Sequence, residues 1–379
     1  MKSKVSLVKC NDYGSRNVYD AVEKAVDLLG GIDCFVKPGS RVLIKPNLLS
    51  AKPPDSGVDT HPEVLRSVIR LVKKAGGIIQ VGDSPGGSVK KMADVYTVSG
   101  TRKVCEEENV ELINFDRIKM VQPRSAYRGG MKNIPIAKAP LEADVFISLP
   151  KFKTHMLMTL TAGVKNVFGI VPGLSKTECH KSAPNPAAFA KLLVDIYSFA
   201  KPHLSILDGI TGMEGDGPGT GGTLRKINLI AASADAVSMD AVLACIMGLK
   251  PSDIGTTREA DRRKLGIGLM KKIEIVGNNL KDFVQSDFKL PKTGIYHVIP
   301  NFLLRSLSVF FKVKPDVIPD KCKHCGICVR SCPMGAISDR DGRIRFDYKK
   351  CILCMCCHEF CPENAVFIRE NLFNKIIRT

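Results

Sequence analysis

Short runs of β-branched and aliphatic residues recur along most of the chain. They lie at 4–10, 41–47, 77–84, 110–116, 144–150, 204–209, 227–233 and 272–277. Amphipathic stretches at about 18–29 and 62–75 separate the first of these runs. Strands that alternate with helices in this way are typical of βαβ units and a mostly parallel sheet. The pattern therefore predicts an α/β domain over 1–290, with helices on both faces of the sheet.

Polar segments end, or directly follow, four of the predicted strands. They are KPN (45–47), GDS (82–84), KFKTH (151–155) and the glycine-rich segment 209–222. Ligands of open parallel sheets bind beyond the C-terminal ends of the strands. We therefore expect these four segments to meet at one edge of the sheet and to form a cleft there.

The densest group of basic side chains lies in KFKTHMLMTLTAGVKNVFG (151–169). It contains Lys151, Lys153, His155, Lys165 and Asn166. Lysines bind anions as point charges, and a histidine exchanges a proton near neutral pH. The small apolar residues between the two basic groups favour a cleft-facing segment, and the alternative is a solvated basic loop. His155 is the first candidate for proton transfer, and the other four are candidates for binding an anion.

Four further residues are candidates for the same anion site: Lys45, Asn47, His61 and Asp83. The THPE segment (60–63) is typical of a helix start, with Thr60 as the N-cap. Capping by Thr60 leaves His61 without a structural role, which favours a binding role for it.

The segment 208–222 contains seven glycines together with Asp208 and Glu214. Its glycines match G-x-G-x-x-G, but a strand pattern follows, whereas a dinucleotide-binding motif opens a helix. Such glycine density indicates backbone close to a ligand or a mobile lid, with a plain surface loop as the alternative. Asp208 and Glu214 are second candidates for the catalytic acid–base group.

Eight of the fourteen cysteines form two copies of C-x₂-C-x₂-C-x₃-C-P, at 322–333 and 351–362. This spacing gives three thiolates to one cluster and the fourth to its neighbour, which predicts two [4Fe–4S] clusters. One cluster takes Cys322, Cys325, Cys328 and Cys361, and the other takes Cys351, Cys354, Cys357 and Cys332. Spacing alone selects Cys357 over Cys356. Zinc is the weaker alternative for paired C-x₂-C units.

Residues 319–370 resemble a bacterial-type 2[4Fe–4S] ferredoxin domain. The resemblance implies a small α+β fold with pseudo-twofold symmetry and a role in one-electron transfer. A basic, apolar linker over 291–318 precedes it, with a segment FLLRSLSVFF that suits an amphipathic helix, and a tail at 371–379 follows it.

The segments KPN, THPE, GDS, PKFKTH, KNVFG, MEGDGP and SADAVSMDAV together resemble the family known as DUF362 over about residues 5–280. Members of that family frequently carry a C-terminal ferredoxin domain. The resemblance implies this two-domain architecture and supplies no substrate.

The formal net charge of +18 favours anionic partners. Two oxidised clusters with their thiolates, at about −2 each, lower it to about +14. An acidic redox protein, an anionic small molecule and a peripheral membrane contact all suit this charge, whereas nucleic acid does not, because no basic–aromatic binding module is present. The chain shows neither a signal sequence nor a long apolar run, which predicts a cytoplasmic location, and exposed clusters favour an anaerobic host.

The combined pattern predicts an iron–sulfur oxidoreductase that passes electrons to an anionic substrate or bound cofactor in the α/β cleft. Two alternatives stay open. In the first alternative, the chain is a non-catalytic electron-transfer or assembly partner of another redox protein. In the second, it is a non-redox lyase or isomerase whose clusters are structural. An additional organic cofactor is neither indicated nor excluded by the sequence.

Overall fold

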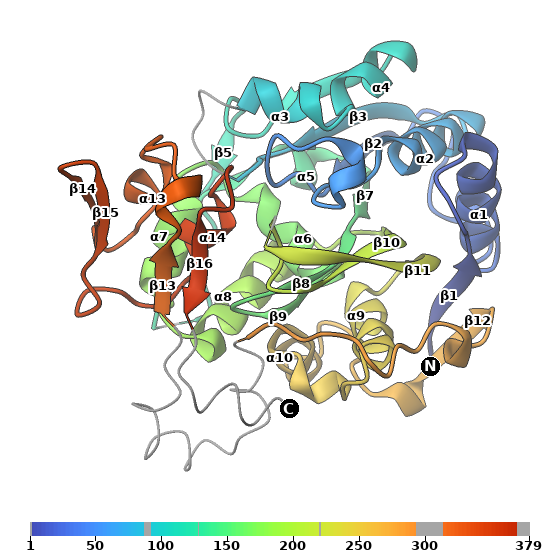
Figure 1. Ribbon diagram of the computed structural model, residues 1–379. Coiled ribbons are helices and arrows are strands. Elements are labelled where there is room, and N and C mark those ends of the chain that lie inside the picture. The colour runs from blue at the N-terminus through green and yellow to red at the C-terminus, as the bar shows by residue number, and fades with distance from the viewer. Residues whose placement is uncertain (1, 87–91, 128, 220, 293–313, 370–379) are drawn as a thin grey trace.

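The computed structural model describes residues 2–86, 92–127, 129–219, 221–292 and 314–369. Figure 1 shows a larger domain that carries one extended sheet and a smaller domain near the C-terminus. The predicted linker 291–318 lies largely outside the described residues, because it falls mostly on 293–313. The predicted tail 371–379 lies wholly outside them, within 370–379.

The larger domain is built on one mixed, mostly parallel sheet. Its strands run in the order β12 (Ile273–Gly277), β1 (Ser3–Lys9), β11 (Gly222–Ser233), β10 (Leu204–Gly215), β7 (Val145–Leu149), β2 (Arg41–Pro46), β3 (Ile78–Asp83) and β4 (Glu111–Asn114). β8 (Lys151–His155) pairs in parallel with β10, and β9 (Thr159–Thr161) pairs antiparallel with β8. β11 is antiparallel to both of its neighbours. The predicted α/β fold with a mostly parallel sheet is confirmed.

Helices cover both faces of this sheet, and alternate residues of each strand point to opposite sides. On β2, Val42 and Ile44 pack with α1 (Ser15–Asp27) and α2 (Pro62–Lys74). Leu43 between them packs on the other face, in a core shared with α8 (Pro186–Phe199). Under β1 and β11, α9 (Ala236–Ile246) covers that second face, and Figure 1 shows α1 and α9 on opposite sides of the sheet.

Shorter elements complete the larger domain. They are α3 (Met92–Val98), α4 (Thr101–Glu107), β5 (Met120–Val121), β6 (Ile136–Ala137), α5 (Ala139–Glu142), α6 (Gly163–Asn166), α7 (Ser175–Ser182) and α10 (Gly255–Arg262). No helix of the described residues is long and apolar enough to cross a membrane.

The glycine-rich segment 208–222 differs from its predicted form. Only 216–221 connect two strands: β10 continues to Gly215 and β11 begins at Gly222, so the two strands form a long hairpin arm. The glycines allow close approach of backbone, since a Cβ on Gly212 would lie 3.2 Å from the carbonyl oxygen of Phe152 on β8. Pairing with β8 therefore stabilises as strand a segment whose composition is typical of a loop.

The smaller domain consists of two antiparallel strand pairs and two short helices. β13 (Lys314–Val317) pairs with β16 (Val366–Arg369), and β14 (Ile337–Arg340) pairs with β15 (Arg343–Phe346). The helices are α13 (Ile327–Arg330) and α14 (Cys356–Glu359).

The sequence duplication in this domain is repeated in its backbone. Three pairs of residues with positive φ are each 29 positions apart: His324 with Leu353, Gly326 with Met355, and Gly335 with Asn364. Four of these six residues are not glycine, although the left-handed region is unfavourable for them. Such conformations persist where the surroundings demand them, and here they shape the two cysteine-bearing loops.

Candidate functional site

The predicted crossed ligation defines two groups of cysteines, and the structure shows which of these thiols lie near one another. Burial, with repulsion from nearby Cys361, Cys325 and Cys322, raises the pKa of the Cys328 thiol to about 11. Burial, with repulsion first from Cys354, Cys351 and Cys332, raises the pKa of Cys357 well above its ordinary value. Cysteines of both copies thus lie near one another, as the crossed ligation requires, and the assignment of each ligand stays a prediction.

The surroundings of these cysteines fit two [4Fe–4S] clusters. The Ala336 N–H donates to Cys332 Sγ at 3.2 Å, and the Ala365 N–H donates to Cys361 Sγ at 3.2 Å. Such hydrogen bonds to sulfur are among the features that set cluster potentials. The second group borders a small cavity whose other lining residues are mainly apolar: Pro315, Pro333, Met334, Ile337, Phe346, Ile352 and Met355.

Cys356 lies beside this cavity and is fully buried. Hydrogen bonding to Cys354, then burial, raises its pKa well above the ordinary value, and the nearby Glu359 adds to that effect. Cys356 therefore lies near both Cys354 and the carboxylate of Glu359. The choice of Cys357 as the ligand stays a prediction.

A cavity of about 60 Å³ lies between the larger domain and the segment around α14. We call it the lysine pocket. Five of the residues predicted for anion binding line it: Lys45, Asn47, Asp83, Lys165 and Asn166. Residues that the sequence did not single out also line it, among them Ser84, Lys176, His180, Glu359 and Phe360. The ends of β2 and β3 contribute to its wall, as expected for an open parallel sheet.

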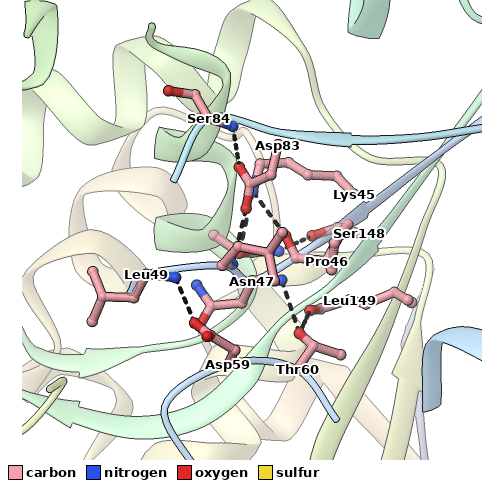
Figure 2. A network of polar contacts seen from close by, with 12 residues as sticks. Lys45, Pro46, Asn47, Leu49, Asp59, Thr60, Asp83, Ser84, Ser148 and Leu149 are labelled. Atoms are coloured by element: carbon pink, nitrogen blue, oxygen red, sulfur yellow. Dashed lines mark hydrogen bonds and ion pairs between the residues drawn. The ribbon is translucent and has the colours of Figure 1, made fainter. Parts of the chain in front are cut away.

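Lys45 and Asp83 form a buried ion pair at one side of the pocket, and Figure 2 shows them facing one another. Lys45 Nζ lies 2.8 Å from Asp83 Oδ1, and each residue is 1% exposed. Burial lowers the pKa of Lys45 and raises that of Asp83, and the attraction within the pair opposes both shifts. A Cβ on Gly169 would lie 2.4 Å from Lys45 Nζ, so only glycine fits against this pair.

Two other lysines of the pocket lack such a carboxylate contact. Lys165 is half-buried, and its Nζ lies 5.7 Å from the ring centre of Phe168. Lys176 is 7% exposed and donates to the carbonyl oxygen of Ser84 at 2.8 Å and to its hydroxyl. Burial lowers the pKa of both amines, that of Lys176 to about 8.

His180 completes this side of the pocket. It follows Lys176 by four residues on α7, so both side chains lie on one face of that helix. Its ring stacks on Phe189 with centroids 4.1 Å apart, and burial lowers its pKa to about 3. The sequence pattern did not single out Lys176 and His180, and their helical spacing is the signal that would have paired them.

Lys151, Asp208 and His61 lie in a separate network. Lys151 Nζ lies 2.8 Å from Asp208 Oδ2 and 2.7 Å from the hydroxyl of Tyr13, which donates to Asp208 Oδ1 at 2.8 Å. The His61 N–H donates to Asp208 Oδ2 at 2.9 Å, and its ring stacks on Tyr13 at 3.7 Å. None of these residues lines the lysine pocket, and their polar atoms are largely satisfied by one another.

The predicted helix cap at Thr60 is wrong by one residue. His61 is the N-cap of α2, and its Nδ1 accepts from the N–H of Glu63 at 3.2 Å. Thr60 instead joins two segments, because its hydroxyl accepts from the Asn47 N–H at 2.8 Å and donates to the Leu149 carbonyl at 2.7 Å (Figure 2).

Lys153 and Glu214 also lie away from the lysine pocket. Lys153 donates to the Val58 carbonyl at 2.5 Å. Burial lowers its pKa to about 7 and raises that of its neighbour Asp59 to about 7, with their mutual attraction opposing both shifts. Glu214 lies 3.3 Å from Arg225 and accepts from the Lys289 N–H at 3.1 Å, which indicates a structural ion pair.

His155 lies behind the pocket and points to its cluster-bearing side. Its Nδ1 accepts from the N–H groups of Leu157 at 3.0 Å and Met158 at 3.3 Å. Nε2 therefore carries the proton of the neutral ring, and it lies 3.6 Å from Glu359 Oε2. Burial, with the nearby Lys165, holds the pKa of His155 well below its ordinary value.

The hairpin arm contacts the smaller domain closely. His358 Nε2 lies 3.1 Å from the carbonyl oxygen of Asp216, and Lys52 Nζ donates to the Pro362 carbonyl at 2.7 Å. A Cβ on Gly221 would lie 2.5 Å from His358 Cε1, and one on Gly219 would lie 3.1 Å from the Glu359 carbonyl oxygen. The glycines thus bring backbone close to the cluster-bearing segment, where the sequence had suggested a ligand or a lid.

The fold and these sites define an iron–sulfur protein with an α/β domain and a ferredoxin-like domain. Residues 42–245 match the family model "Domain of unknown function (DUF362)", and residues 314–362 match the model "4Fe-4S dicluster domain". The chain therefore belongs to the DUF362 family, and its cofactors are two [4Fe–4S] clusters.

Two relatives illustrate the two parts. The chain is 35% identical over 295 residues to the thylakoid-associated protein sll1697 of Synechocystis sp.. The matched region covers 77% of this chain and 89% of that protein. Its ferredoxin-like part is 39% identical over 54 residues to the pyruvate synthase subunit PorD of Methanocaldococcus jannaschii, covering 14% of this chain and 63% of that protein.

A looser structural likeness is to the lactate racemase apoprotein of Thermoanaerobacterium thermosaccharolyticum. The TM-score is 0.42 with 14% sequence identity, over 66% of this chain and 58% of that one. This likeness is too weak to support an argument about function.

Proposed function

We propose that this protein is an oxidoreductase in which electrons pass from two [4Fe–4S] clusters to an anionic substrate or bound cofactor in the lysine pocket. The supporting observation is that Glu359 and Phe360 line the pocket and lie between Cys357 and Cys361. Glu359 is two residues along the chain from each of these cysteines, and its carboxylate lies near Cys354, a predicted ligand of the second cluster. The pocket thus adjoins predicted ligands of both clusters.

The clusters, when bound, supply one electron each. The residues of the chain hold the acceptor: Lys165 and Lys176 attract its negative charge, and the rings of Phe168 and Phe360 limit access of water. The neutral ring of His155 positions Glu359, because its Nε2–H points to that carboxyl group at the pocket wall. The Glu359 carboxyl group is our candidate for passing on the proton that accompanies reduction. Asp208 and Glu214 are engaged in ion pairs elsewhere.

Electrons must reach the clusters from a one-electron donor protein, which we propose to be acidic. The net charge of +18 supports this, because opposite charge speeds the encounter of two proteins. We further propose a cytoplasmic location with peripheral membrane contact, for which the support is this charge and the description of sll1697 as thylakoid-associated. Flotation with anionic vesicles at low and high salt tests the contact, and an absence of salt-sensitive flotation would contradict it.

Single-turnover oxidation tests the proposed reaction. Anoxic protein with reduced clusters is mixed with anionic acceptors, and cluster absorbance is followed. We expect reoxidation that Lys165→Gln slows at least tenfold, while the exposed substitution Lys281→Gln leaves it unchanged. If Lys165→Gln has no effect but electron transfer to a partner protein proceeds, the chain is a carrier and not a reductase. If the protein converts the acceptor at the same rate whether its clusters are oxidised or reduced, the clusters are structural.

A further inference from the structure

The lysine pocket holds two amines, those of Lys165 and Lys176, that no carboxylate of the described residues contacts. Lys165 has no hydrogen-bond or ion-pair partner among the residues that the structure describes. Lys176 donates only to Ser84 within the described chain, and the nearby Asp116 is separated from it by the Ser84 hydroxyl, which donates to Asp116 Oδ1 at 2.6 Å. A buried ammonium is unfavourable unless an opposite charge meets it. This arrangement suits an anion bound between the two amines.

Two uncharged polar groups of the same pocket also lack a partner. His180 Nδ1 is buried and unbonded, and His180 is 5% exposed. The buried Asn47 Oδ1 is unbonded as well. The oxygen and nitrogen of an asparagine amide are interchangeable by rotation, so Asn47 can present its amino group. Both residues can therefore donate a hydrogen bond to an oxyanion in the pocket.

The charge and size of the pocket restrict which anion fits. The lining contains three lysines (45, 165 and 176) and two carboxylates (Asp83 and Glu359), so three minus two leaves one net positive charge on the lining itself. Asp116 lies near Lys176 behind Ser84 and does not line the pocket. Its volume is about 60 Å³. At roughly 10–15 Å³ for each water-sized group, this space holds about four to six non-hydrogen atoms.

We propose that the lysine pocket binds a short-chain carboxylate. Such a molecule carries a single negative charge and has about four to six non-hydrogen atoms. The inference rests on the proposed function, because it narrows the class of the electron acceptor. A carboxylate spreads one charge over two oxygens, which suits two amines, and its carbon atoms suit the rings of Phe168 and Phe360. Phosphate esters carry about −1.5 to −2 at neutral pH, more than the lining neutralises.

Isothermal titration calorimetry of the anoxic, oxidised holoprotein tests this inference without any electron transfer. The probes are acetate, propionate and pyruvate, compared with hexanoate, succinate and inorganic phosphate. We expect the first three to bind at least tenfold more tightly than the other three. Lys165→Gln and Lys176→Gln should each weaken binding about 10- to 100-fold, because each removes a charge-assisted hydrogen bond. The exposed Lys281→Gln should leave binding unchanged.

Equal or tighter binding of hexanoate, succinate or phosphate would overturn the inference, and this size series needs no variant to fold. The inference would also be overturned if Lys165→Gln, with its full iron content, bound the small carboxylates as tightly as wild type does. The proposed function fails separately. If small carboxylates bind but pyruvate does not reoxidise reduced clusters, the pocket assignment stands and the reductase proposal falls. If a larger acceptor reoxidises the clusters and small carboxylates do not bind, the reductase proposal stands and the pocket assignment falls.

Discussion

At the scale of single residues, contact with a carboxylate separates structural lysines from binding lysines. Lys45 and Lys151 each lie 2.8 Å from a buried aspartate. Removing one partner of such a buried pair costs about 3–5 kcal/mol, because the other charge is left without compensation. Lys165 has no such contact among the described residues, and the partial burial of its amine is therefore better explained by a ligand.

Replacement of the adjacent cysteines Cys356 and Cys357 tests the ligand assignment. We expect Cys357→Ser to lower the iron content of anoxically purified protein from about eight to about four per chain, because it removes a thiolate from one cubane cluster. Cys356→Ser, the matched control one position away, should keep about eight irons. Iron and sulfide counts with EPR of the reduced protein give the answer. The opposite pattern would make Cys356 the ligand.

At the scale of helices and strands, the sequence predicted most elements but not their long-range contacts. The runs at 4–10 and 41–47 form β1 and β2, and the stretch at 62–75 forms α2, since each carries its own periodicity. The glycine-rich hairpin arm was missed because its strand structure depends on pairing with β8, about 60 residues away in the chain. Lys176 and His180 were missed because they are isolated polar residues whose meeting with Lys45 depends on the fold.

Asp240 on α9 holds the short helix that carries Lys165. Its carboxylate accepts from the N–H groups of Gly163 at 2.7 Å and Val164 at 3.0 Å, at the start of α6. Burial raises the pKa of Asp240 to about 7. Since this folded-state value exceeds the ordinary 3.8, Asp240 stabilises the fold most at low pH, and that contribution is lost as pH rises towards 7.

Unfolding by urea measures this effect. For wild type relative to Asp240→Asn, we expect the difference in free energy of unfolding to fall between pH 5.5 and 7 and to level off above about 7.5, because only wild type titrates there. Circular dichroism at each pH follows the transition, with iron content checked before each experiment. A difference that is constant or rises with pH would show that Asp240 is ionised throughout.

Gly221 in the hairpin arm tests the contact with the smaller domain. A side chain there would lie 2.5 Å from His358 Cε1, so we expect Gly221→Val to displace α14 from the arm. Hydrogen exchange of peptides covering 355–362 should speed up at least tenfold, and reoxidation of the clusters by a pocket-bound acceptor should slow. Thr223→Val, an exposed and nearly isosteric change on β11, is the control. Unchanged exchange in Gly221→Val would show that the arm does not support α14.

At the scale of the whole molecule, the cofactors could be predicted from the sequence and the pocket only in part. All eight predicted cluster ligands lie within 322–361, so their spacing alone identifies two clusters. The lysine pocket instead combines β2, β3, α6 and α7 with the C-terminal end of α14 and Phe360. Glu359 and Phe360 gave no signal for it, because their role depends on how the two domains meet.

The charge of the whole molecule predicts how an electron donor reaches it. With a net charge of +18, or about +14 with both clusters oxidised, the protein should attract an acidic ferredoxin or flavodoxin over distances comparable with the Debye length. We expect the second-order rate of cluster reduction by such a donor to fall at least tenfold between about 0.02 and 0.5 M salt, because ions screen this attraction. A neutral photochemical reductant, measured by the same stopped-flow absorbance, should show little salt dependence. If reduction by the acidic protein is equally insensitive to salt, the donor docks through apolar contacts and the charge serves another purpose.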